Sequence, residues 1–249
     1  MRFLAVLALA ALPALAAFTP QEEPTKPIPT VEEPSTEVLF PIELQVDKGT
    51  RHQLAGMGVR VKKKFFMKFK VYAMGFYIDE TTALESLRKA AGDLSVKKLE
   101  GNRAFRDALL KDGFGRSIRL VMVRDVDADD MAEAFEDSLW PRMETTVEAS
   151  KEETATEPPA ELLAAKAALA TFRGFFEKEA EEDQVLDFTW TAGGKLQATM
   201  DGKRFPVVEN LHLCQALFDV YLGDDPISDQ AKTNIFTALH TKLHPPATR

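Results

Sequence analysis

The sequence predicts an α+β fold with a mainly antiparallel sheet and helices layered on it. A long strand-like run at residues 65–79 follows a run that can pair with it, and three short strand-like runs separated by turns occupy residues 185–208. Short turns join antiparallel strands, whereas parallel strands need a crossover of roughly a dozen residues or more. Strands and helices also come in groups rather than in strict alternation, which excludes a doubly wound fold.

The N-terminus predicts a secretory signal peptide. Residues 1–17 carry an arginine at position 2, then an apolar stretch, and then small residues at Ala14 and Ala16, as such peptides do. A membrane anchor is the competing interpretation, but the apolar stretch is shorter than the roughly 20 residues of a spanning helix. We therefore expect an exported protein, periplasmic or secreted, cleaved near Ala16 or Ala17 and without a membrane span in its mature form.

The rest of the chain is expected to form a linker and one domain. Residues 18–38 are rich in Pro, Glu and Thr and offer almost nothing to bury, which predicts a disordered linker. Residues 39–249 form the predicted domain, which is long enough for one sizeable core. Its single cysteine, Cys214, lies in an apolar helical pattern and is interpreted as a core residue.

The charge balance argues against a nucleic-acid partner. The net charge is −8 and the pI about 5.2, whereas nucleic-acid binding needs a basic surface. One basic cluster stands out, which consists of Lys62, Lys63, Lys64, Lys68 and Lys70. We interpret it as a solubilising face of an edge strand; a patch that binds a charged ligand is the alternative.

The first half of the domain contains the longest strand. In residues 65–79 Lys68 and Lys70 alternate with apolar residues, and residues 53–62 predict the antiparallel partner. A bend is expected at Gly75. The next elements are a helix at 83–91 after the capping run 79–82, a helix at 103–111 and a strand at 117–124.

The second half contains helices on either side of a meander of three strands. Asp130 and Glu133 resemble a capping box before a helical pattern at 131–149. A loop at 149–159 precedes an amphipathic helix at 161–181. The last elements are strands at 185–191, 196–200 and 204–208 and helices at 210–222 and 229–243, the last capped by Ser228.

Arg60 and Tyr72 are the candidate functional residues. Arg60 follows Gly56-x-Gly58 and Tyr72 lies on the long strand, so the two can face each other across the sheet. A guanidinium binds a carboxylate or enolate through two parallel hydrogen bonds, and a phenol donates one more. The pair therefore indicates an anion anchor. A structural salt bridge of Arg60 and a core role for Tyr72 are the alternatives.

Several motifs together resemble the chalcone isomerase superfamily, and its chalcone isomerase-like, fatty-acid-binding branch more than the plant flavonoid enzyme. They are Gly56-x-Gly58-Val59-Arg60, the strand Val71-Tyr72-Ala73-x-Gly75-x-Tyr77, the meander with DFTW and its Gly-Gly turn, and YLGDDPIS at 221–228. The resemblance implies an open-faced β-sandwich, a large antiparallel sheet with a layer of helices on one side and a ligand cleft between them.

The resemblance also implies roles for single residues. Arg60 matches the arginine that stabilises a phenolate in the isomerase and pairs with the lipid carboxylate in the fatty-acid-binding relatives. Tyr72 stands where the enzyme has a threonine and the binding members a tyrosine, which favours an acid headgroup. Asp130 and Asp137 fall near a tyrosine and an asparagine of the enzyme's cleft, where they would repel a phenolate.

Three functions are therefore open. The first is binding of a small amphipathic acid, fatty-acid-like, or of a phenolic ligand, through Arg60 and Tyr72. The second is an isomerase, an intramolecular lyase that closes a chalcone-like ring by conjugate addition while Arg60 stabilises the oxyanion. The third is a structural or interaction module whose cleft is closed. The expected contacts of a ligand's apolar part are Met74, Phe76, Phe135, Leu139, Leu217 and Phe218.

No cofactor and no metal site are expected. Asp125, Asp127, Asp129 and Glu136 have the spacing of a calcium-binding loop. However, Asp130 replaces the turn glycine that such loops need, and a strand rather than a helix precedes the segment. We interpret these carboxylates as helix-capping residues.

Overall fold

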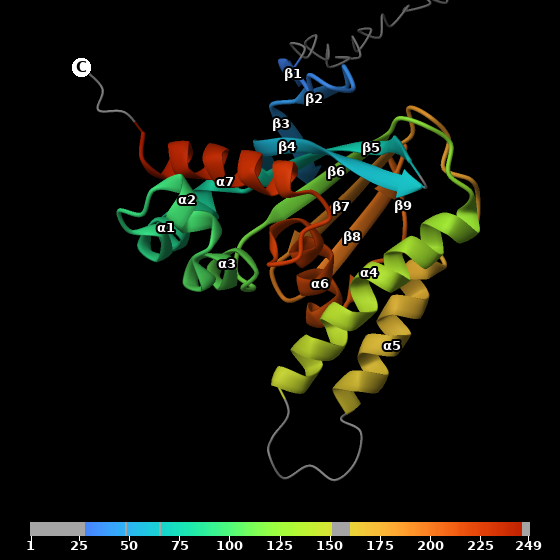
Figure 1. Cartoon of the computed structure of the whole chain (residues 1–249). Coiled ribbons are helices and arrows are strands. Elements are labelled where there is room, and N and C mark those ends of the chain that lie inside the picture. The colour runs from blue at the N-terminus through green and yellow to red at the C-terminus, as the bar shows by residue number, and fades with distance from the viewer. Residues whose placement is uncertain (1–27, 48, 65, 151–159, 246–249) are drawn as a thin grey trace, which may run out of the picture.

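The computed structural model describes residues 28–47, 49–64, 66–150 and 160–245. These form a large antiparallel sheet with helices on one side (Figure 1), which confirms the predicted fold. The strand order is β10-β8-β7-β6-β5-β4-β3, and β9 pairs with β8. The strands are β3 (Glu43–Asp47), β4 (Thr50–Lys64), β5 (Met67–Ile78), β6 (Arg116–Met122), β7 (Val185–Thr191), β8 (Lys195–Met200), β9 (Lys203–Arg204) and β10 (Val208–Glu209).

The helices lie in two groups around the sheet. Figure 1 shows α7 along β4, with α1 to α3 beside it, and α4 next to α5. The helices of the described residues are α1 (Glu80–Ala91), α2 (Val96–Glu100), α3 (Arg103–Leu109), α4 (Ala128–Ala149), α5 (Ala160–Arg173), α6 (Leu211–Leu222) and α7 (Asp229–Leu243). Within these residues, no helix is both long and apolar enough to cross a bilayer.

The core is asymmetric about the sheet. Tyr72, Met74 and Phe76 of β5 belong to the large cluster that the helices cover. Ala73 and Tyr77, which alternate with them, pack on the opposite face in a small second cluster with Phe40 of β2 (Leu39–Pro41) and Leu44 of β3. Successive strand residues point to opposite faces, so this part of β5 is buried on both sides.

Short-range signals located most helix ends correctly. Asp79 caps α1 by accepting a hydrogen bond from the Thr81 amide, and Ser228 caps α7 through the Ala231 amide. The capping box at Asp130 was wrong, because α4 begins two residues earlier, at Ala128, with Asp127 as its N-cap. The sequence analysis did not detect α2.

One longer-range prediction was also wrong. The fifth helix ends at Arg173 rather than 181, because Phe176 turns back and stacks on Phe135 of α4, with ring centroids 4.8 Å apart. The register of β4 and β5 shifts between Leu54 and Met57, directly beside the Met57–Gly75 pair, and again between Arg60 and Val61. Phe40 packs where a side chain at Gly75 would lie.

Part of the predicted linker is folded. Its strand β1 (Thr30–Glu32) pairs with β2 (Leu39–Pro41) at the start of the predicted domain. The intervening turn is held by the buried Glu33, whose carboxylate accepts a hydrogen bond from the Thr36 amide. The hydrogen bond of the Glu33 carboxylate thus holds this turn, which has few apolar residues to bury. The predicted signal peptide, residues 1–17, lies outside the described residues, and the domain boundaries remain predictions.

Candidate functional site

The structure places Arg60 and Tyr72 directly opposite each other on β4 and β5, as the sequence analysis expected. The guanidinium carbon of Arg60 lies 5.6 Å from the centroid of the Tyr72 ring, within the range of a cation–π contact. Arg60 is half-buried, whereas Tyr72 is buried completely. The arginine therefore lies between solvent and a buried phenol.

The glycines before Arg60 position this pair by admitting a helix. A Cβ atom at Gly58 would overlap Ala231 of α7, and one at Gly56 would overlap the Ile235 backbone. Gly56 also has a φ of 127°, which other residues rarely adopt. These two glycines therefore make room for α7 rather than for a ligand.

A second tyrosine completes the buried end of the site. The hydroxyl oxygens of Tyr72 and Tyr221 lie 2.8 Å apart, and burial raises the pKa of both phenols, while the nearby Arg60 charge lowers it. Both groups are therefore protonated at neutral pH. One hydroxyl proton serves the bond between them, so the pair retains a second proton to donate.

Sequence reasoning missed Tyr221 as a site residue. It lies on α6, 149 residues from Tyr72, and its helical neighbours mark it as a core residue. The available signal was its position at the start of YLGDDPIS, one of the motifs that carry the family resemblance.

Arg60 makes no ion pair with a carboxylate of the described residues. The described residues therefore contain no structural salt bridge of Arg60. Arg119 shows the contrast, since it also lies on the sheet but its Nε is 2.7 Å from an oxygen of Asp187. An arginine that is half-buried and unpaired has its charge available for a ligand.

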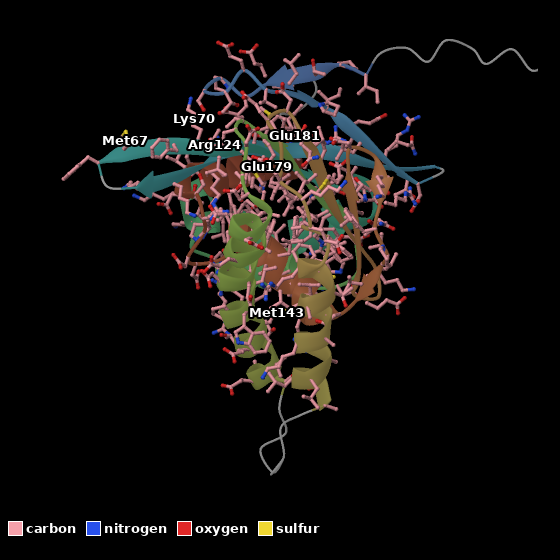
Figure 2. The ribbon with its side chains drawn as sticks, turned by 90° about the vertical axis from the view of Figure 1, so that its right-hand side faces the viewer. Met67, Lys70, Arg124, Met143, Glu179 and Glu181 are labelled. Atoms are coloured by element: carbon pink, nitrogen blue, oxygen red, sulfur yellow. The ribbon has the colours of Figure 1, made fainter. Side chains whose placement is uncertain are left out.

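Arg60 lies on the wall of an open cleft of about 650 Å³. The cleft runs between the outer part of the β4–β5 hairpin and the start of α4. Arg124 lies beside the hairpin (Figure 2), and its guanidinium carbon is 5.1 Å from the Phe69 ring centroid. The cations are Arg60, Lys62, Lys63 and Arg124, the carboxylates Asp125, Asp127 and Asp130, and the apolar side chains Phe69, Val71, Val126, Met131 and Ala134.

The six predicted apolar contacts do not line this cleft. All are buried in the main core, where Phe76 packs edge-on against Phe218 with centroids 6.3 Å apart. A ligand tail would reach them only by displacing such contacts. They are Met74, Phe76, Phe135, Leu139, Leu217 and Phe218.

The two predicted acidic positions separate in the structure. Asp130 lines the cleft together with Asp125 and Asp127, whereas Asp137 is exposed on α4 and lies outside it. Like charges on a cleft wall raise the free energy of a second negative charge. The cleft therefore suits a ligand with one anionic group beside Arg60 better than one with charges at both ends.

The other chemistry-bearing cluster is closed. His52 Nδ1 lies 2.8 Å from Ser117 Oγ, which lies 2.8 Å from Thr189 Oγ1. His52 and Ser117 are fully buried, and burial lowers the pKa of His52 to about 4. A substrate has no access to this serine. Among the described residues, no group of histidine, cysteine and carboxylate side chains is arranged to hold a metal ion.

Comparisons with known proteins agree with this architecture. A family model described as chalcone isomerase like matches residues 50–236. Fatty-acid-binding protein 2 of Arabidopsis thaliana is 27% identical over 209 residues, or 82% of this chain and 49% of the relative. Fatty-acid-binding protein 1 of the same plant is 26% identical over 211 residues, or 82% and 68%. The chain thus spans about half the length of the first relative.

A solved structure shows the same fold. The crystal structure of an Arabidopsis thaliana fatty-acid binding protein matches with a TM-score of 0.67 at 22% identity, covering 86% of this chain and 99% of that one. At such identity the match supports the fold, and the ligand must be argued from the site.

Proposed function

The chain belongs to the chalcone isomerase-like family, and from this premise we propose that it binds a small amphipathic acid, such as a fatty acid, in the cleft beside Arg60. The names of the two plant relatives support this ligand class. The observation that carries the proposal is an arginine that has no carboxylate partner among the described residues and that lies on the wall of an open cleft, against a pair of buried phenols.

The guanidinium of Arg60 is the donor that faces the cleft, and it offers two parallel N–H groups to the two oxygens of a carboxylate. Tyr72 and Tyr221 are buried behind it and do not line the cleft, so they support Arg60 from the protein side. Because Arg60 is half-buried, water screens the interaction less than at a fully exposed site. A single carboxylate therefore matches the charge and the two parallel donors of Arg60.

The apolar part of the ligand has a surface next to the anchor. Phe69 and Val71 on β5 and Met131 and Ala134 on α4 line the same cleft. Its volume of about 650 Å³ falls within the roughly 300–1,000 Å³ of small-molecule sites. Apolar wall and cationic end together fit an amphipathic acid.

Displacement of a fluorescent fatty acid tests the proposal. Arg60→Gln keeps the side-chain length but removes the charge, and we expect Kd to rise about 10- to 100-fold, the effect of one hydrogen bond to a charged group. Tyr72→Phe should raise it by less. Arg103→Gln is the matched control, because Arg103 is an exposed arginine on α3 and its loss should leave Kd unchanged.

Native mass spectrometry of the purified protein supplies an independent readout, since a bound acid would appear as a mass adduct that Arg60→Gln loses. If no acid co-purifies or titrates, and Arg60→Gln behaves as the wild type, the proposal is wrong.

Ring closure of a chalcone-like substrate is the enzymatic alternative. Arg60 would stabilise an oxyanion in the same way, but Tyr72 stands where the resemblance gives the enzyme a threonine and the binding members a tyrosine. An assay with chalcones decides between the two. Turnover that is lost in Arg60→Ala and kept in Tyr72→Phe would favour the isomerase.

We also propose that the protein acts after export, on the basis of the signal-like residues 1–17. N-terminal sequencing of the protein from a secreting host should find a start after Ala16 or Ala17. An intact Met1 in the exported fraction would contradict the cleavage.

A further inference from the structure

The β4–β5 hairpin is a basic segment in an acidic protein. The chain has 39 Asp and Glu residues and a net charge of −8, yet none of the 39 lies between Asp47 and Asp79. Over the same stretch the lysine cluster and Arg60 all fall on these two strands. The charge is therefore segregated along the fold rather than scattered.

The outer part of this hairpin stands apart from the sheet. The pairing of β3 with β4 ends at Gln53, and the pairing of β6 with β5 ends at Tyr72. One more backbone bond follows on each side, from the Leu54 amide to the Ile42 carbonyl and from the Val123 amide to the Val71 carbonyl, and further out β4 and β5 pair with each other. Figure 2 shows the end of the hairpin, marked by Met67, projecting from the side of the molecule. We call residues 61–64 and 66–70 the basic arm.

The tip of the basic arm exposes large apolar side chains. Phe66 is exposed completely, at 104% of its reference area, and Met67 at 60%. Lysines on an unpaired strand edge are explained by protection against aggregation, but that explanation does not cover a phenylalanine and a methionine at the tip, which work against solubility.

Lysines also face each other within the arm. Lys63 and Lys68 are direct cross-strand partners, and like charges in that position destabilise a strand pair. Within the described residues neither lysine forms an ion pair with a carboxylate. An anionic surface outside the protein would relieve this repulsion, so the arm is suited to a negatively charged partner.

We propose that the basic arm docks the protein on an anionic lipid surface. Lysines held near such a surface are attracted by its negative potential, while Phe66 and Met67 enter the apolar edge of the headgroup region, as the apolar residues of interfacial segments do. The lysines and the apolar tip are both needed for docking. The apolar tip is small, and the net charge of −8 repels the protein from an anionic surface unless the basic arm faces that surface.

Docking would also place the ligand cleft at the bilayer. Lys62, Lys63 and Phe69 belong to the arm and line the cleft, so its opening would lie against the surface that holds amphipathic acids. This last step rests on the proposed function, whereas docking itself does not depend on it.

Vesicle co-sedimentation of the full chain tests the docking. We expect binding to vesicles of phosphatidylcholine mixed with phosphatidylglycerol, weakened by salt, and little binding to phosphatidylcholine alone. Lys68→Gln should weaken binding about fivefold and Phe66→Ser about tenfold. Neither residue lines the cleft, so fatty-acid affinity in detergent-free solution should stay unchanged in both variants.

Matched controls separate the arm from the rest of the surface. Lys97→Gln removes an exposed lysine on α2, and Leu163→Ser an exposed leucine on α5; both should bind vesicles as the wild type does. Every variant carries the same N-terminal segment, so only the arm can cause a difference. Equal binding by all variants, or capture of the arm by an acidic polypeptide or by RNA but not by anionic vesicles, would overturn the proposal.

Discussion

The inner and outer halves of the β4–β5 hairpin differ in burial. On β5, every residue from Val71 to Ile78 is buried, while most residues from Phe66 to Lys70 are exposed. The change occurs where β6 stops pairing with β5. Arg60 and Tyr72 lie at this boundary, where a buried donor pair and an open cleft meet. A functional site can thus arise at the point where a strand pair leaves the sheet.

The largest expected effect comes from replacing a phenylalanine by alanine in each half of the hairpin and comparing the losses in the free energy of unfolding. Phe76→Ala in the inner half should lower the free energy of unfolding by about 3–5 kcal/mol, because it leaves a cavity in the core. Phe66→Ala at the tip should change it by less than about 0.5 kcal/mol, as exposed substitutions do. Urea unfolding of both variants measures the difference, and similar losses would show that the arm is part of the core.

The buried His52 on β4 should make stability depend on pH. Burial, helped by the Arg116 charge, holds its pKa at about 4, although Asp79 acts in the opposite direction; the unfolded value is about 6.5. His52 is therefore neutral in the folded protein at neutral pH. Its contribution is fully present above about pH 6.5 and is lost as the pH falls to about 4, by about 3 kcal/mol.

Urea unfolding across this pH range measures the effect. The variant His52→Gln separates it from the titration of carboxylates, since it should lack this part of the slope. Equal slopes in variant and wild type would show that His52 titrates normally in the folded protein.

The close contact of β4 with α7 gives the next effect. Gly58→Ala should cost about 2 kcal/mol, because the added methyl overlaps Ala231 and the helix must shift. Gly101→Ala is its control, since a Cβ there meets no atom within 4 Å. Thermal unfolding compares them. If both cost the same, helix packing is not the reason for the glycine.

The tyrosine pair at the boundary should show the smallest effect and a clear coupling. Tyr72→Phe and Tyr221→Phe should each cost about 1–2 kcal/mol, because each leaves a buried hydroxyl without its partner. The double variant should cost less than the sum, since it removes both groups. Strict additivity in the double-mutant cycle would mean that the two hydroxyls do not interact in solution.

The sequence alone determined the features that depend on neighbours along the chain. The caps of α1 and α7, the antiparallel partners and the opposition of Arg60 and Tyr72 follow from residues within a turn or a hairpin of one another. The family resemblance extended this to the sheet with its helix layer, which the structure confirms.

Only the tertiary structure decided what each buried face meets. A periodic pattern of apolar residues predicts burial but does not tell whether protein or ligand covers the buried face. Phe76 and Phe218 are expected from the sequence to contact a ligand, whereas in the structure they pack on each other. Tyr221 joins Tyr72 because α6 packs on the sheet, and Phe176 ends α5 by stacking on Phe135. Such contacts depend on the packing of distant elements, which local sequence patterns do not encode.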